Sequence, residues 1–463
     1  MATSSTKRTE NANPPAAVQH QGEDRSNAIR ARMAAVEPRG LRTYTPSLAV
    51  IARSEGCYHY TPEGRKLADF TSGVLVANLG HNPPAWWRRI LELMQLDRAA
   101  DAGSVPLTTY NAVTELEVLA SERLVASLRA QPGGGRMEHV LWAASGSEAI
   151  QKSLWAAMAH RPGADVILAT RAGFHGKKGL AGAVTGSERD HERDPRVRFI
   201  SFPCDECRSV ERRRLPLDLA PYEKELAAAL KEHGDRLCAV ITEPYLGGGG
   251  SYHPQPEYLQ LLQRFCREHD LVFILDEIQS NFGRTGSMYA FTTYGIEPDI
   301  AVLGKGMANG IPVDAAVGRA DVLGTLNYGE GSDTWSGHPL GCAAVLATLE
   351  AFEQQDVLGH AATLSEVIER HLLRMTKLPA IAAVRGEGTV WGIECAPLGS
   401  QAAGDVANRI VEDCYRGDAS GRAVHLLGPL AGKVLRVAPP LVMPLDEAEE
   451  YLSAMLDIIA HLN

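Results

Sequence analysis

The sequence has few cysteines and no long apolar run. Eight cysteines in 463 residues are too sparse for a scaffold held together by disulfides. No window approaches the roughly 18 consecutive apolar residues that a membrane-spanning helix needs. The first residues, Met1 to Lys7, contain no hydrophobic core of a signal peptide. The sequence therefore predicts a cytoplasmic protein with no membrane among its partners.

An excess of basic residues is also missing. Lys and Arg number 46 against 56 Asp and Glu, which gives a formal charge of −10. This balance argues against nucleic acid as a partner. The glycine run 247–250 lacks the Gly-Lys-Ser/Thr ending of a P-loop, and no G-x-G-x-x-G motif opens a helix after a predicted strand. Nucleotide cofactors are therefore disfavoured.

Cys204 and Cys207 have the C-x-x-C spacing of a zinc or redox site. No second pair lies nearby in the sequence, and no helix is predicted to open after the pair. We interpret the segment as a surface turn and predict no metal site.

The length and the hydrophobic content of 45% predict two or three structural units around sizeable cores. Residues 1–27 are rich in polar residues and are predicted to be a flexible arm. Residues 28–75 contain short alternating runs broken by glycine turns, the pattern of an antiparallel meander, and are predicted to join a small domain. The large domain is assigned to residues 76–338 and the small C-terminal domain to residues 339–463.

In the large domain, apolar runs of strand length alternate with helical patterns. The runs are Val140–Ala143, Asp165–Ala169, Arg198–Ser201, Cys238–Thr242 and Leu271–Asp276. This alternation is typical of a mostly parallel sheet covered by helices on both faces. The predicted fold class is α/β, with a second, smaller α/β domain.

Ligands of an open parallel sheet bind at the carboxyl ends of its strands, so the residues after each apolar run are candidates for a site. Gly146 and Ser147 follow the first run and open a helix, where free amides suit a phosphate. The alternative is an ordinary helix cap. Phe174 follows the second run and is either a core anchor or a ring that lies on a planar ligand.

Two charged residues also follow apolar runs that are predicted to be strands. Asp276 follows five apolar residues, so burial would raise its proton affinity unless a cation such as a protonated pyridine nitrogen keeps it ionised. A carboxylate that pairs with a structural arginine or caps a turn is the simpler alternative. Lys305 lies between two glycines after the run Ile300–Leu303, a position that suits a Schiff-base lysine. A phosphate site, an aromatic ring, a carboxylate and this lysine together supply what pyridoxal phosphate needs.

From about Leu48 to its C-terminus, the chain resembles the class III, or ω-, aminotransferases of the fold type I pyridoxal-phosphate enzymes. The motifs that carry the resemblance are Gly146-Ser-Glu-Ala149, Phe174-His-Gly176, Thr242-Glu-Pro244, Asp276-Glu-Ile-Gln279, Gly283-Arg-Thr-Gly286, Pro298-Asp299, Gly304-Lys-Gly306, Thr334-Trp-Ser-Gly-His-Pro339 and Leu435-Arg-Val-Ala-Pro-Pro440. The resemblance implies a seven-stranded, mostly parallel sheet and pyridoxal 5′-phosphate as cofactor. It also implies ping-pong transfer of an amino group from an amino acid or ω-amino donor to a 2-oxo acid.

The resemblance further implies roles for single residues. Lys305 would hold the cofactor as a Schiff base and shuttle a proton, and Asp276 would keep the pyridine nitrogen protonated. Phe174 would stack on the ring, and Gln279 would bond its phenolic oxygen. Further cofactor contacts are implied for Gly146, Ser147, His175 and Glu243.

Substrate and subunit contacts are implied in the same way. Arg436 would take a substrate carboxylate in a bidentate pair, and Val74 would line the substrate pocket. Thr334 would reach the phosphate in the neighbouring subunit's site, which implies a homodimer with shared active sites. The other partners would be a small-molecule amino donor and an oxo-acid acceptor.

One departure from the family bears on the substrate. Gly248 stands where enzymes acting on 4-aminobutyrate or ornithine commonly carry a glutamate that pairs with the carboxylate-binding arginine. Arg436 is therefore expected to lack that partner. A decarboxylating transaminase of the dialkylglycine type also lacks this glutamate and is the alternative function. An aminomutase fits Gln279 and the segment 283–286 less well, and a catalytically silent cofactor-binding protein would be expected to lose Lys305 first.

Overall fold

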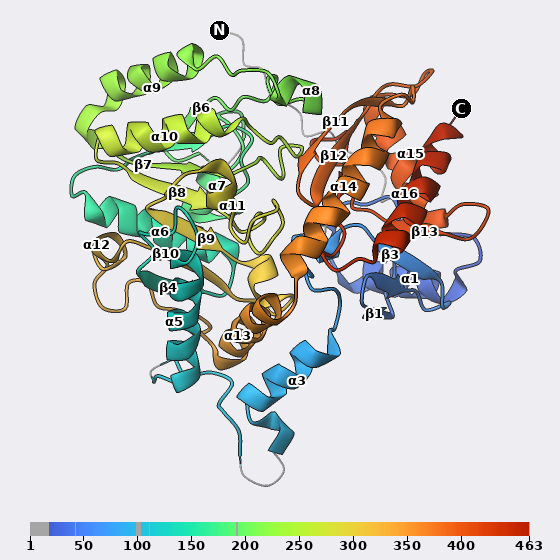
Figure 1. Ribbon diagram of the computed structural model, residues 1–463, viewed down its shortest axis with the longest axis horizontal. Coiled ribbons are helices and arrows are strands. Elements are labelled where there is room, and N and C mark those ends of the chain that lie inside the picture. The colour runs from blue at the N-terminus through green and yellow to red at the C-terminus, as the bar shows by residue number, and fades with distance from the viewer. Residues whose placement is uncertain (1–17, 42, 99–102, 111, 191–192, 463) are drawn as a thin grey trace.

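The fold is given by a computed structural model, which describes residues 18–41, 43–98, 103–110, 112–190 and 193–462 (Figure 1). Its largest sheet has seven strands in the order β4-β10-β9-β8-β7-β5-β6. The strands are β4 His139–Ala143, β5 Val166–Thr170, β6 Val197–Ile200, β7 Leu237–Thr242, β8 Val272–Asp276, β9 Ile300–Leu303 and β10 Asp314–Gly318. Strands β5 to β9 pair with one another in parallel, whereas β10 is antiparallel to both of its neighbours, β4 and β9. The predicted α/β class with a mostly parallel sheet is confirmed.

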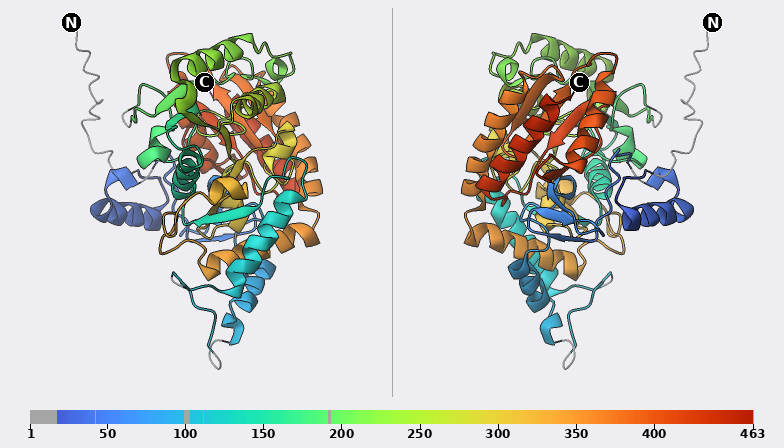
Figure 2. Two further views of the ribbon diagram at one scale, coloured as in Figure 1. Left: turned by 90° about the vertical axis from the view of Figure 1, so that its left-hand side faces the viewer. Right: turned by 90° about the vertical axis from the view of Figure 1, so that its right-hand side faces the viewer.

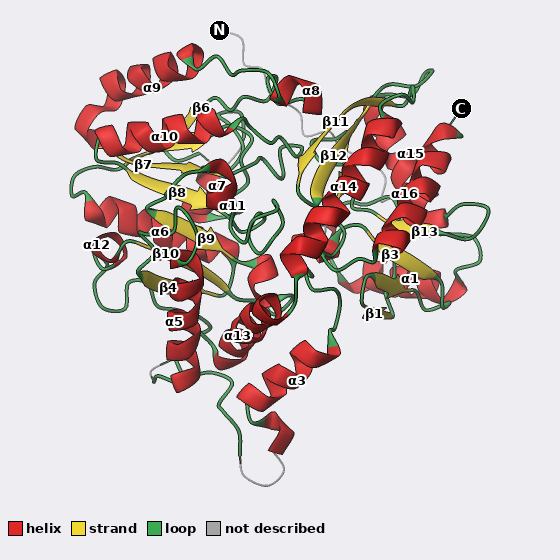
Figure 3. Ribbon diagram, viewed as in Figure 1, coloured by secondary structure: helices red, strands yellow, loops and turns green. Residues whose placement is uncertain are grey.

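The central strands are apolar along their whole length because both faces of the sheet are covered. In β8, Phe273 and Leu275 belong to one core, whereas Val272 and Ile274 belong to another on the opposite face. Figure 3 shows these strands enclosed by helices. One face is covered by α6 Gly146–His160, and the other by α5 Glu115–Arg129, α10 Pro256–Glu268 and α13 Pro339–Gln354.

Two smaller sheets lie together in the second part of the molecule. The first has the order β1-β2-β3-β13, and the second β11-β12-β14. Their strands are β1 Arg53–Glu55, β2 Tyr58–Tyr60, β3 Lys66–Asp69, β11 Ile381–Glu387, β12 Val390–Cys395, β13 Ala423–His425 and β14 Val434–Val437. The predicted meander is confirmed, because β1, β2 and β3 pair antiparallel.

The meander shares its sheet and its core with the C-terminal part of the chain. Leu67 of β3 pairs with Ala423 of β13 in parallel. Phe70 packs in one cluster with residues of α14 Val357–Met375, α15 Ala403–Arg416 and α16 Leu445–Ala460. Figure 2 shows the N-terminal strands beside these helices. The N-terminal segment and the C-terminal residues from α14 onward therefore build one unit, whereas α13, which the sequence assigned to the small domain, packs on the large sheet.

The chain already packs against the rest of the protein before residue 27, where the predicted flexible arm ends. Helix α1 begins at Asp24, and Glu23 and Ser26 are buried. The Glu23 carboxylate accepts hydrogen bonds from Arg30 (2.7 Å) and from Tyr415 Oη (2.9 Å). Because these contacts are polar, no apolar period marks the helix. The flexible-arm prediction is wrong for residues 18–27, and residues 1–17 lie outside the described residues.

The remaining helices are short or peripheral. They are α2 Ser72–Leu75, α3 Pro84–Leu93, α7 Gly179–Ala183, α8 Val210–Arg213, α9 Ala220–His233, α11 Ala290–Tyr294 and α12 Ala320–Leu323, with 3₁₀ turns at Arg39–Leu41, Leu96–Arg98, Gly234–Arg236 and Lys305–Ala308. Among the helices of the described ranges, none combines the length and the apolar character needed to cross a bilayer.

Candidate active site

A cavity of about 400 Å³ lies at the carboxyl edge of the large sheet. It is lined by eight of the residues that the sequence predicted for the cofactor: Gly146, Ser147, Phe174, His175, Glu243, Asp276, Gln279 and Lys305. They follow the strands β4, β5, β7, β8 and β9, whose ends meet at this edge. Residues from five separate segments are thus brought to one cavity.

The start of α6 is both a helix cap and a candidate phosphate site, the two interpretations that its sequence allowed. Ser145 is the N-cap, and its hydroxyl accepts a hydrogen bond from the Glu148 amide, while the Glu148 carboxylate accepts one from the Ala144 amide (3.0 Å). The cap therefore does not use Ser147 Oγ or the amides of Gly146 and Ser147. Within the described ranges these groups have no hydrogen-bond partner, and they line the cavity as an anion site would require.

Asp276 pairs with a histidine and not with an arginine, and it also caps the turn that follows it, as one form of the simpler alternative predicted. His175 Nδ1 lies 2.7 Å from Asp276 Oδ2, and the Ile278 amide donates to Oδ1 (3.1 Å). Both side chains are buried, and His175 Nε2 has no partner in the described part of the chain. The pair presents a carboxylate of fixed orientation to the cavity.

Lys305 begins the 3₁₀ turn after β9, with a left-handed φ of 48°. Removal of its amine from water lowers its pKa, and the charge of Asp276 opposes that shift. The two flanking glycines are required by protein neighbours. A Cβ at Gly304 would overlap the Asp314 carboxylate, and a Cβ at Gly306 would overlap the Asn78 amide.

Glu243 ties two loops of the cavity together. Its carboxylate accepts from the amides of Phe174 (2.8 Å) and Gly247 (3.1 Å), and burial raises its pKa to about 7. Phe174 is 40% exposed, which favours a ring open to a ligand over a core anchor. The buried Oε1 of Gln279 has no partner among the described residues. These groups fit a planar cofactor that carries polar atoms at the edge of its ring.

Arg436, on β14, is buried, and its Nη2 donates to the Gly247 carbonyl (2.6 Å). Burial lowers its pKa, although the Tyr245 and Glu243 charges act in the opposite direction. Its Nε has no partner within the described ranges. Among the described residues no glutamate forms an ion pair with this arginine, and Arg436 is not one of the residues that line the cavity.

Two further predicted residues, like Arg436, do not line the cavity of their own chain. Val74 is 40% exposed, and Val76 lines the cavity instead. Thr334 is exposed and follows Asp333, which forms an ion pair with Lys152 (2.7 Å).

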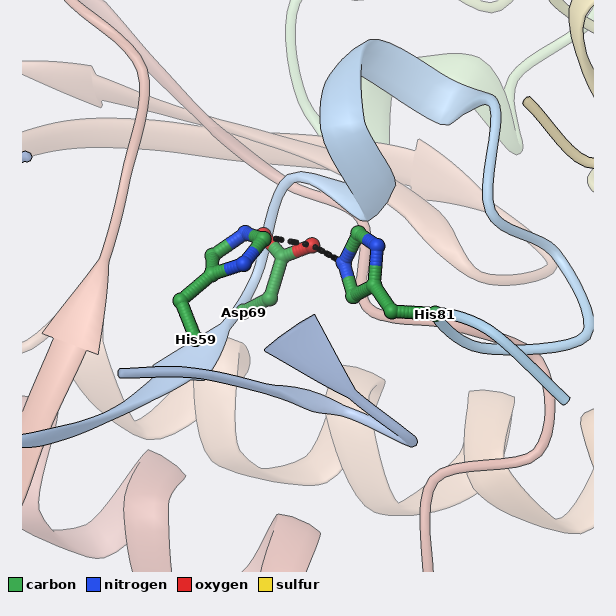
Figure 4. A group of neighbouring side chains, drawn as sticks. All are labelled: His59, Asp69 and His81. Carbon is green, nitrogen blue, oxygen red and sulfur yellow. Dashed lines mark hydrogen bonds and ion pairs between the residues drawn. The ribbon is translucent and has the colours of Figure 1, made fainter. Parts of the chain in front are cut away.

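The turn that contains Val74 is anchored by the carboxylate of Asp69, whose Oδ2 accepts from the Gly73 amide (3.2 Å). Its Oδ1 accepts from the amide and hydroxyl of Thr71 (2.7 Å each), and its Oδ2 accepts from His81 Nε2 (2.7 Å). Burial would raise the pKa of this carboxyl, but hydrogen bonds from His59 and His81 hold it well below its usual range. The three side chains in Figure 4 lie close enough to hold a metal ion. Because both oxygens of the Asp69 carboxylate already accept hydrogen bonds, we assign these three side chains a structural role.

The Cys204–Cys207 segment is a turn, as predicted, but Cys207 is buried rather than at the surface. Burial raises the pKa of both thiols, that of Cys204 to about 12. Neither thiol is therefore activated for redox or metal chemistry at neutral pH.

Asp314 is a cavity residue that the sequence analysis missed. It is the first residue of β10, and burial raises its pKa to about 7. The signal that would have found it is a carboxylate at the start of the apolar run Ala315–Val317, nine positions after Lys305.

Comparisons with known proteins agree with this geometry. A family model described as aminotransferase class-III matches residues 40–459. A 2-aminoadipate transaminase of Pseudomonas putida is 31% identical over 87% of this chain and 93% of its own. An acetylornithine aminotransferase of Bacillus subtilis is 30% identical over 89% of this chain and 95% of its own. The solved structure of an amine transaminase from an uncultivated Pseudomonas species, 26% identical, covers 92% of this chain and 97% of its own with a TM-score of 0.78.

Proposed function

Because the chain belongs to the class III aminotransferases, which depend on pyridoxal phosphate, we propose that Lys305 carries the cofactor and that the amino donor is an amino acid or an ω-amino compound. The acceptor is a 2-oxo acid, and the two half-reactions follow a ping-pong order. The observation that carries this proposal is the position of Lys305 in one cavity with a free helix start and the Asp276–His175 pair.

The residues of the cavity fit the cofactor's three polar regions. Gly146 and Ser147 offer unused donors to the phosphate. Asp276 fits the pyridine nitrogen, and Gln279, which lines the cavity, can donate its side-chain NH2 group to the ring's oxygen substituent. When bound, the cofactor supplies an electron sink for the substrate carbon that loses a proton.

The protein's own groups move and hold the protons. Asp276, oriented by His175, keeps a proton on the pyridine nitrogen through its negative charge. Lys305 Nζ takes the proton from the substrate carbon and returns it, a task that its lowered pKa favours because more of the amine is neutral. Phe174 and Ile278 enclose the reacting region and limit access of water.

Arg436 is the proposed site for a substrate carboxylate. Its guanidinium is buried and holds one carbonyl partner, so a carboxylate would find donors already stripped of water. The named relatives, an acetylornithine aminotransferase and a 2-aminoadipate transaminase, support plain amino transfer. We therefore do not carry the decarboxylating alternative forward.

We further propose a cytoplasmic homodimer in which Thr334 completes the partner's phosphate site. The aromatic side chains near Thr334, Tyr328 and Trp335, are exposed in the single chain, as interface residues would be. All eight cysteines are free thiols, which fits a reducing compartment.

The test is the covalent attachment of the cofactor. Borohydride reduction of the holoprotein followed by peptide mass spectrometry should place the pyridoxyl group on Lys305. Lys305→Ala should lose both the label and turnover, whereas Lys377→Ala, at an exposed lysine, should keep both. A label that persists in Lys305→Ala contradicts the proposal. A screen of amino donors that follows conversion of the cofactor to the pyridoxamine form would then identify the substrate.

A further inference from the structure

Asp314 is a buried carboxylate with no partner. It is 8% exposed, lines the cavity, and has neither a hydrogen bond nor an ion pair within the described ranges. Burying an unpaired carboxylate is unfavourable unless the group is neutralised or bound by a ligand. The position of the Asp314 side chain therefore indicates that it interacts with the ligand that the cavity binds.

The carboxyl lies between the reactive lysine and the start of α6. Its Oδ1 packs against Gly304, the residue before Lys305, so closely that a Cβ there would overlap it. The same oxygen lies 3.5 Å from the point that a Cβ of Gly146 would occupy. Gly146 is the first residue of α6, so Asp314 adjoins the proposed phosphate end of the cavity.

Three charged groups act on Asp314. Lys305 favours its ionised form, while Asp276 and Glu148 disfavour it. Burial is the largest influence, and together these effects raise the pKa to about 7. A further anion nearby would raise its proton affinity again.

We propose that Asp314 couples cofactor binding to the uptake of a proton. When the phosphate binds at Gly146 and Ser147, the carboxyl takes a proton from solvent, so that a neutral group and not a second anion adjoins the phosphate. Two like charges held close together in a water-poor cavity do not both stay ionised. This inference rests on the phosphate assignment of the proposed function.

The probe is pyridoxamine 5′-phosphate, which forms no covalent bond with Lys305. Its equilibrium affinity for the full-length protein is measured from pH 6.5 to 9, with Asp314→Asn and Asp314→Ala beside the wild type. As the pH rises above the pKa of the Asp314 carboxyl, the affinity of the wild type for pyridoxamine 5′-phosphate should fall more steeply than that of either variant. The difference should reach up to about tenfold per pH unit. Calorimetry in two buffers of different ionisation enthalpy should show about one proton fewer taken up by the variants.

Glu148→Gln is the matched control. It removes one negative charge at the same helix start, but Glu148 bonds the Ala144 amide and does not line the cavity, so the wild-type slope should remain. Equal slopes and equal proton uptake in wild type and Asp314→Asn overturn the inference, as does loss of the slope in Glu148→Gln. If Asp314→Asn fails to fold, the Ala variant gives the same comparison. Absence of pyridoxamine phosphate binding to the wild type would instead overturn the proposed function.

Discussion

His175 and Asp276 form a buried pair across two strand ends of the large sheet, with 2.7 Å between Nδ1 and Oδ2. The imidazole comes from the loop after β5 and the carboxylate from the end of β8. The pair fixes one carboxylate oxygen, so the charge that the cofactor meets has a set direction. Removing the histidine should therefore affect the cofactor even if the carboxylate remains.

Asp276→Asn should reduce kcat by at least about 100-fold. The substitution removes the negative charge that is positioned to stabilise the protonated pyridine nitrogen. His175→Ala should reduce kcat/KM by about 10- to 150-fold, the equivalent of about 1.5–3 kcal/mol for a hydrogen bond to a charged group. Steady-state kinetics and the absorbance of the bound cofactor provide the measurements. His371→Ala, at a buried histidine of the small domain, should leave the absorbance unchanged. Wild-type spectra and kinetics in His175→Ala would argue against a positioning role.

Gly304→Ala should disturb the cavity through Asp314. The new Cβ would overlap the carboxylate, and overpacking of this kind costs about 1–3 kcal/mol. Asp314→Ala in the same protein should restore most of the loss, because it removes the overlapping group. Melting temperatures of the four proteins of the double-mutant cycle measure the coupling. Gly40→Ala, where a Cβ meets nothing within 4 Å, serves as control, and additive effects of the two substitutions would refute the predicted overlap.

Arg436→Met should raise KM for a 2-oxo acid by about 10- to 100-fold, because the hydrogen bonds to the charged carboxylate are lost. KM for an aldehyde acceptor, which has no carboxylate, should change little. Comparing the two acceptors separates substrate binding from general damage to the site. A similar rise in KM for both would assign Arg436 to packing against Gly247 rather than to the substrate.

Glu394 should make the small domain sensitive to acid. Burial alone would raise its pKa, but hydrogen bonds from Lys433 and Arg385 and the charge of Arg385 lower it to about 2. Because the pKa in the folded state lies below the ordinary value of 4.5, the stabilisation is present above pH 4.5 and is lost as the pH falls toward 2. Because solvent screens the partly exposed partners Lys433 and Arg208, the effect is on the order of 1–2 kcal/mol.

Glu394→Gln should destabilise the protein at pH 7 by about 3–5 kcal/mol, because it leaves buried Arg385 without its carboxylate. Its melting temperature should then depend less on pH between 5 and 3 than that of the wild type. Glu55→Gln, at an exposed ion pair with Arg53, should behave like the wild type in both respects. A pH dependence that Glu394→Gln leaves intact would assign the acid sensitivity to other groups.

The candidate site was predictable where it depends on parallel strands. Asp276 and Lys305 follow apolar runs, and the ends of parallel strands necessarily meet at one edge. Asp314 escaped this rule because β10 is antiparallel, so that its first residue and not its last lies at that edge, opposite Ala143 of β4. A sequence gives no sign of strand direction when the run itself is short and rich in alanine.

Other misses have separate physical causes. Four successive residues from Ser72 to Leu75 have positive φ, so the side-chain directions of a regular turn do not apply, and Val76 replaces Val74 at the cavity. Helix α1 is held by Glu23, Arg30 and Tyr415, and polar contacts between distant residues leave no periodic pattern.

The pairing of β3 with β13 has a consequence for synthesis on the ribosome. Leu67 emerges early, but its partner Ala423 is translated only near the end of the chain. Until then the edge of β3 and the turn that Asp69 anchors lack their neighbour, while all seven strands of the large sheet are already available. The strands that carry the cavity residues are thus complete before the sheet that contains β3 can close. We therefore expect the large sheet to form before the small domain, in which β3 and β13 can pair only when the chain is nearly complete.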